Sequence, residues 1–208
     1  MAKKKGEKYQ AIIEAAVKVI SANGYRRAPV KKIARAAGVA GGTVYLYFDS
    51  KEEMMVDVFK EFLGNFIEEI KLEIAEVKDS AKKLQKLVEA HLTKVEANFN
   101  LAVVCLVELR QPDTMLRVAT GKVLRHYFQL IEEIVEEGQN NGTFNPRLNI
   151  FLVRQMIFGT LDQIVTSWVW HRRPGLADQA PQVYEMLLDG LTGSVERTGC
   201  VGLINSIG

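Results

Sequence analysis

The stretch AGGTVYLYFDSKEEM, residues 40–54, carries side chains that could contact a nucleic acid. Thr43, Tyr45 and Tyr47 supply hydroxyl groups, which can donate hydrogen bonds to phosphate oxygens. The two glycines before them would let a backbone approach a partner closely and would leave amide groups free for phosphate. The chemistry predicted for this stretch is therefore binding of an anionic polymer.

A helical wheel at about 100° per residue divides the stretch into faces. The same helix then predicts one side that packs on a core, one that contacts phosphates and one that meets base edges in a major groove. These sides are an apolar arc (Val44, Phe48), a hydroxyl edge (Thr43, Tyr47) and an outer arc (Gly42, Tyr45, Leu46).

Basic side chains are concentrated at the start of the chain. Residues 1–51 hold 11 Lys or Arg and three acidic residues, whereas the whole chain of 208 residues has a net charge of only +2. This asymmetry predicts contact with nucleic acid or an anionic membrane, and a solvated basic face is the alternative. The cations that could add phosphate contacts are Arg26, Lys31, Lys32 and Lys51.

The elements that must position these residues have helical periodicity almost throughout, and no stretch alternates with a period of two. The sequence therefore predicts an all-α fold. A loop is expected from Gly138 to Pro146, and Ser50 with Glu53 predicts a capping box. The expected helices cover residues 7–22, 29–36, 42–48, 51–77, 80–98, 101–109, 113–138, 148–171 and 178–196.

The run from Asn23 to Met54 resembles the signature of the TetR family of bacterial repressors, from its Asn-Gly-Tyr through Gly-Thr-x-Tyr-x-Tyr-Phe to Ser-Lys-Glu-Glu. The resemblance implies a homodimer with a three-helix, helix-turn-helix DNA-binding domain over residues 1–51. A helical ligand-binding and dimerisation domain would follow over residues 52–196, and residues 197–208 would form a tail. It also implies phosphate contacts from Thr43, Tyr47 and Lys51, and base contacts from Gly41, Gly42, Tyr45 and Leu46.

One position departs from that signature. Family members often carry a polar or charged side chain where Gly41 stands, so the base-facing arc offers little side-chain hydrogen bonding. We expect recognition to depend on thymine methyl groups, close backbone approach and DNA shape. Two-fold symmetry would make the double-stranded operator pseudo-palindromic.

Two later segments, Glu108–Arg117 and Arg154–Trp170, are similar to the FadR-type members of the family. Those are repressors of fatty-acid degradation genes that long-chain acyl-CoA releases from DNA. The resemblance implies an apolar cavity, with arginine forks for the phosphates of the effector; ion pairs with Glu108, Asp113 or Asp162 are the alternative. Candidate ligand-binding residues are Phe62, Phe66, Phe99, Val103, Leu106, Arg110, Arg117, Phe128, Arg154, Phe158 and Trp168.

The expected helix over residues 148–171 contains Gly159, which costs helix stability. It predicts either a close helix crossing or room for a ligand. Together with residues 178–196, this helix also has the apolar content for a four-helix dimer interface.

Other functions find less support. The histidines and cysteines have no metal-ligand spacing, and no nucleophile lies beside a base, so we expect neither metal, cofactor nor enzyme. The start lacks a secretory signal and no apolar run could span a bilayer, which predicts a cytoplasmic protein without a membrane partner. A sensor of another hydrophobic ligand such as a cationic drug, an acyl-CoA hydrolase or transferase, and a membrane-surface protein remain as alternatives.

Overall fold

The computed structural model describes residues 6–108, 114–172 and 174–193, leaving out the side chains of residues 107, 108, 114–117 and 119. Within these residues every regular element is a helix, which confirms the predicted all-α class. None of the described helices is long and apolar enough to cross a membrane. The elements are α1 (Glu7–Asn23), α2 (Val30–Ala36), α3 (Gly41–Tyr47), α4 (Lys51–Ile74), α5 (Ser80–Ala97), α6 (Phe99–Glu108), α7 (Thr114–Asn140), α8 (Ile150–His171), the 3₁₀ turn η1 (Ala177–Gln179) and α9 (Ala180–Thr192).

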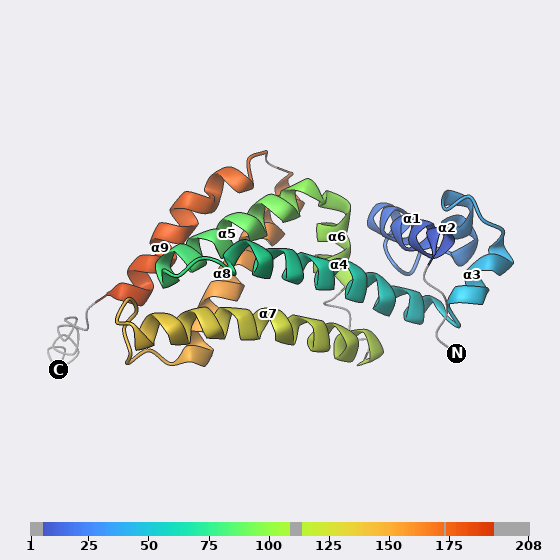
Figure 1. The fold of residues 1–208 in the computed structure, drawn as a ribbon. Coiled ribbons are helices and arrows are strands. Elements are labelled where there is room, and N and C mark those ends of the chain that lie inside the picture. The colour runs from blue at the N-terminus through green and yellow to red at the C-terminus, as the bar shows by residue number, and fades with distance from the viewer. Residues whose placement is uncertain (1–5, 109–113, 173, 194–208) are drawn as a thin grey trace, which may run out of the picture.

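The first three helices form a small bundle at one end of an elongated molecule (Figure 1). Gly24 stops α1 in the left-handed region, at φ 77°, and Gly38 turns the chain between α2 and α3 at φ 67°. The amide of Val39 donates to the Ala34 oxygen at 3.0 Å, which closes this turn. The two short helices therefore meet through a glycine turn, as in a helix-turn-helix.

Two buried cores divide the molecule. The N-terminal core joins α1–α3 to the first turns of α4, and the C-terminal core joins the rest of α4 to α5 and α7–α9. Helix α4 therefore belongs to both. Its N-terminal half contributes Met54, Met55, Val58 and Phe59 to the N-terminal core, and its C-terminal half contributes Ile67, Ile70 and Ile74 to the C-terminal core.

The start of α4 is fixed by its cap. Ser50 Oγ accepts a hydrogen bond from the Glu53 amide at 3.0 Å, as the capping box predicts. The reciprocal bond to the Glu53 carboxylate comes from the amide of Asp49, one residue earlier than in the standard motif.

In the C-terminal part, α5 is the central helix and touches α4, α6, α7, α8 and α9. Helix α7 runs along the underside of α4 (Figure 1). The Glu96 carboxylate on α5 accepts bonds from the backbone amides of Gly175, Leu176 and Ala177 at 2.8–3.3 Å. These bonds fasten the chain ahead of α9 onto α5.

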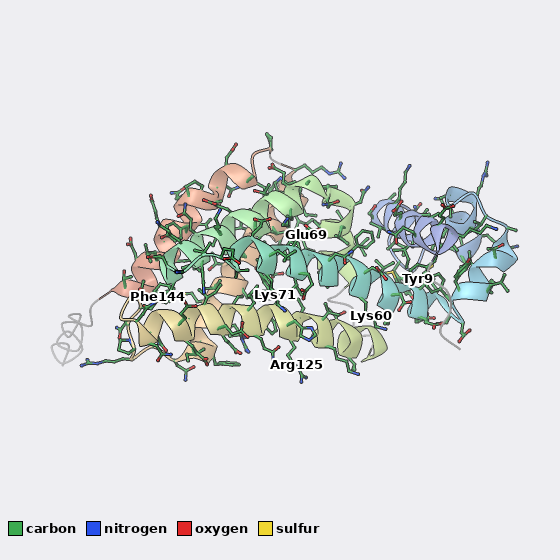
Figure 2. The ribbon with its side chains drawn as sticks, in the orientation of Figure 1. Tyr9, Lys60, Glu69, Lys71, Arg125 and Phe144 are labelled. Atoms are coloured by element: carbon green, nitrogen blue, oxygen red, sulfur yellow. The ribbon has the colours of Figure 1, made fainter. Side chains whose placement is uncertain are left out.

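The loop prediction is wrong at Gly138, because α7 continues to Asn140. The Phe144 ring folds back onto Gly138, and a Cβ atom there would lie 2.0 Å from Phe144 Cδ2. The Phe144 amide also donates to the Gly138 oxygen at 2.9 Å, and its side chain is buried (Figure 2). Close packing, and not a turn, therefore requires glycine at this position.

The change Gly138→Ala should lower the free energy of unfolding by about 1–3 kcal/mol through overpacking, although alanine normally favours a helix by ~1 kcal/mol. Chemical denaturation would measure the change. The matched control is Gly121→Ala on the same helix, where no described neighbour lies within 4 Å of the added carbon. Equal effects of the two substitutions would contradict the packing assigned to Phe144.

Candidate functional site

Helix α3 presents the outer arc to solvent. The side chains of Tyr45 and Leu46 are 58% and 73% exposed, whereas Val44 and Phe48 are buried. Phe48 lies just beyond the helix in extended conformation, so its burial comes from the end of α3 and not from a helical face. The exposed arc, with the exposed Gly41 and Gly42, is therefore free to meet a partner.

The hydroxyl edge is held against α1. Tyr47 and Thr43 are half-buried, and the ring centroids of Tyr47 and Tyr9 lie 6.2 Å apart. Tyr9 stacks on Phe48 at 5.4 Å and its hydroxyl donates to Asp57 at 3.1 Å, which ties α3 to α1 and α4 (Figure 2). Burial and then the Asp57 carboxylate raise the pKa of Tyr9, so its hydroxyl stays a donor.

The four candidate cations differ in how far they are held by neighbouring groups. Arg26 and Lys31 are exposed, and Lys32 is exposed while donating to Asn23 Oδ1 at 2.6 Å. Lys51 at the start of α4 donates to the Tyr25 backbone oxygen, and its ammonium lies 4.2 Å from the Tyr25 ring centroid. Lys51 is therefore held in place beside the end of α3.

The C-terminal part contains a cavity of about 720 Å³ between α4, α5, α6, α7 and α8. This volume lies within the range usual for small-molecule sites. Its walls are mainly apolar, and its exposed polar residues lie on α4, on α5 and at Asn98 just after α5. The lining residues are Phe62, Leu63, Asn65, Phe66, Ile67, Glu69, His91, Thr93, Lys94, Val95, Ala97, Asn98, Leu101, Ala102, Cys105, Leu106, Leu124, Tyr127, Phe158, Asp162 and Val165.

Two buried polar side chains meet in the cavity wall. His91 Nδ1 and the Tyr127 hydroxyl lie 2.7 Å apart, and the rings of Phe66 and Phe158 surround the pair. Burial lowers the pKa of His91 to about 4 and raises that of Tyr127, so both are neutral at neutral pH. Burial also raises the pKa of the nearby Cys105 thiol to about 12, which makes a thiolate nucleophile unfavourable there.

An ion-pair cluster crosses the cavity rim between α5 and α4. Lys94 Nζ lies 2.8 Å from a Glu69 carboxylate oxygen and 2.9 Å from one of Glu73. Hydrogen bonds to Glu69 and then Glu73 raise the pKa of Lys94, so it stays charged. At this rim two carboxylates surround one cation, so the cluster carries a net negative charge.

The candidate ligand-binding residues separate into three groups. Phe62, Phe66, Leu106 and Phe158 line the cavity, whereas Phe99, Val103, Phe128, Arg154 and Trp168 do not. Arg110 and the side chain of Arg117 lie outside the described part of the structure.

Contacts away from the cavity explain the placement of the second group. Arg154 pairs with Glu132 at 2.7 Å, and its guanidinium lies 4.8 Å from the Phe128 ring centroid and 4.5 Å from that of Phe151. Phe99 packs edge-on against Trp168 at 5.3 Å. Arg154 therefore has the structural pairing considered as its alternative, although with Glu132.

Sequence reasoning missed His91, Tyr127 and Lys94 as cavity residues. The apolar spacing of α5, with Leu84, Leu87 and Val88 buried ahead of His91, places this histidine on the core face and was the available signal. Among the described residues no group of three His, Cys, Asp or Glu side chains could hold a metal ion.

Two family models match the two parts of the chain that contain these sites. Residues 12–58 match the family of bacterial regulatory proteins, tetR family, and residues 59–190 match the YsiA-like protein, C-terminal region. The chain belongs to the TetR family of transcriptional regulators. It is therefore a regulator and not an enzyme, and regulators with this helix-turn-helix bind DNA.

Its relatives include fatty-acid regulators. The fatty acid metabolism regulator protein of Bacillus subtilis is 40% identical over 91% of this chain and 98% of its own length. The fatty acid degradation regulator FadR of Bacillus halodurans superposes with a TM-score of 0.87 at 45% identity, covering 91% of this chain and 98% of its own. FadR of Bacillus subtilis in complex with stearoyl-CoA superposes at 0.84 with 40% identity, covering 88% and 99%.

If the outer arc of α3 reads bases, Tyr45→Ala should weaken operator binding roughly fivefold to tenfold, and reduce discrimination at the contacted base pair. Fluorescence anisotropy with a set of single-base operator variants measures both quantities. Lys31→Ala is the comparison, because a lost phosphate contact weakens all sequences alike and lowers the salt slope by about 1. A uniform loss for Tyr45→Ala would show that this tyrosine is not a base reader.

Proposed function

We propose that the protein represses fatty-acid degradation genes and that long-chain acyl-CoA releases it from DNA. The observation that carries this proposal is the apolar cavity, whose walls include α4 and α6, the two lining helices that also pack in the N-terminal core. The similarity to FadR of Bacillus subtilis, with its stearoyl-CoA complex, supports the ligand class. A repressor acts where the chromosome lies, which places it in the bacterial cytoplasm.

The cavity chemistry suits an acyl chain. Burying methylene groups contributes ~0.8 kcal/mol each, so a long chain can supply most of the affinity. The phosphates of the head need cations, and the Glu69–Lys94–Glu73 cluster at the rim is net negative. We therefore assign the head to Arg110 and Arg117, which remain proposed contacts.

Four cavity residues would connect a bound ligand to the N-terminal core, which holds the DNA-binding helices. Phe62 and Leu63 of α4, with Leu101 and Cys105 of α6, line the cavity and also pack against the N-terminal core. Helix α6 further contacts α1, and its Val104 is buried in that core. A ligand that separates α4 from α6 would therefore tilt the DNA-binding helices. Release requires that the tilted state bind the ligand more tightly.

Saturating stearoyl-CoA should abolish binding to DNA from upstream of fatty-acid degradation genes in a gel-shift series. Free CoA, which lacks the tail that fills the cavity, should leave the complex intact. A hydrophobic cationic drug tests the alternative of an efflux regulator. Unchanged DNA binding at saturating acyl-CoA would reject the proposed effector, and release by the drug alone would favour the alternative.

The proposed homodimer uses an unpartnered apolar face of α8 and α9. Leu152 is 63% exposed and Met186 is 67% exposed, and Phe151 and Met156 are exposed beside them. Gly159 lies on the stripe of Leu152 and Met156, and a Cβ added to it would have no described atom within 4 Å, so neither a crossing within the chain nor the cavity explains it. Close approach of a second copy would, and two heads would then bind a pseudo-palindromic operator.

The double change Leu152→Glu and Met186→Glu should convert the dimer to a monomer, because charges cannot be buried unpaired in an apolar interface. Light scattering after size exclusion measures the mass, and circular dichroism checks the helical fold. The control is Leu72→Glu on α4. Leu72 is likewise exposed, at 75%, but lies outside this face, so this variant should stay dimeric. A dimeric double variant would place the interface elsewhere.

A further inference from the structure

The wall of the cavity contains one buried hydrogen-bonding unit, the pair His91 and Tyr127. His91 is 8% exposed and Tyr127 is 2% exposed. The other polar side chains of the lining are less buried: Asn65, Glu69, Thr93 and Asn98 are exposed, and the charged Lys94 and Asp162 are half-buried. Two aromatic rings pack against the pair, with the Phe66 ring centroid 5.2 Å from that of His91 and the Phe158 ring centroid 6.2 Å from that of Tyr127. A ligand that fills the cavity therefore meets this polar point among apolar groups.

Proton counting shows what the pair can offer. The neutral imidazole carries one N–H and the phenol carries one O–H. The bond between Nδ1 and the Tyr127 hydroxyl uses one of these two hydrogens. The other remains, either on His91 Nε2 or on the Tyr127 oxygen, depending on the tautomer. In both arrangements one donor is left for a ligand.

We propose that this donor binds the thioester carbonyl oxygen of the effector. The inference rests on the proposed function, because it takes long-chain acyl-CoA as the ligand class. In a saturated acyl-CoA the carbonyl is the hydrogen-bonding group directly attached to the hydrocarbon chain. The one free donor of the buried pair, which lies among apolar rings, matches a single acceptor at the head of an apolar chain.

The pair thereby determines specificity as well as affinity. A ligand of the same length without the carbonyl oxygen would displace water from the pair and leave its donor unsatisfied. Buried polar groups that lose a partner weaken binding more than the hydrogen bond alone contributes. Rim residues exposed to solvent carry no such penalty, because water replaces the ligand.

The test compares stearoyl-CoA with S-octadecyl-CoA, a thioether that lacks only the carbonyl oxygen. Isothermal titration with the full-length protein should give stearoyl-CoA an advantage of roughly fivefold to 150-fold, the cost of leaving one buried donor unsatisfied. In the double variant His91→Leu with Tyr127→Phe the advantage should fall to about onefold, because both partners are replaced by apolar groups of similar shape. Its affinity for the thioether should equal or exceed that of the unaltered protein, because no donor is left unsatisfied, and this retained binding shows that the cavity still folds.

A polar change at the rim is the matched control. Thr93→Val lines the same cavity but lies at its exposed edge, and it should keep the full preference for the thioester. Equal binding of the two ligands by the unaltered protein, or a preference that survives in the double variant, would overturn the assignment while leaving acyl-CoA as the effector. Binding of neither ligand would instead reject acyl-CoA as the effector class, and the assignment with it.

Discussion

The burial of one helix in two separate cores is the constraint on which the rest of the structure depends. Helix α4 is capped by Ser50, contributes Phe59 to the N-terminal core and contributes Ile67 to the C-terminal core. Close-packed interiors deform little, so each half of the helix is fixed to its own core. Between the two halves lie Phe62, Leu63 and Phe66, which line the cavity. A ligand bound in the cavity would therefore act on the segment that joins the two cores.

Helix α6 provides a second connection between the two cores. Val104 is buried in the N-terminal core while the neighbouring Ala102 belongs to the C-terminal core and lines the cavity. The N-terminal helices are thus held by two helices and not by a single flexible rod. Glu96 fixes the opposite side, because it ties α5 to the chain ahead of α9. A ligand that shifts α4 or α6 works against a rigid frame, which favours two discrete arrangements.

The fold and the exposed face of α3 could be predicted from the sequence because both follow local rules. Helical period, the glycine stops at Gly24 and Gly38, and the cap at Ser50 are written in short segments. The sequence could not predict that Gly138 lies within a helix, because glycine is required there by the Phe144 ring, which folds back onto it. The cavity lining depends likewise on how five helices pack. Phe99 and Phe158 were both candidate cavity residues, but only packing decides that Phe99 meets Trp168 and Phe158 lines the cavity.

The chemistry of α3 explains why a modest movement could be enough for regulation. Helices α1–α3 of each subunit form its DNA-binding head. Each head exposes Tyr45 and Leu46 beside two glycines, so it offers few side-chain hydrogen bonds to base edges. Specificity from one head is then low, and most of it must come from two heads that fit successive major grooves together. In the proposed dimer the spacing of the heads therefore becomes the sensitive quantity. A coupling free energy of about 1–3 kcal/mol, typical of allosteric proteins, changes affinity fivefold or more, and a small tilt of α4 in each subunit acts on that spacing twice.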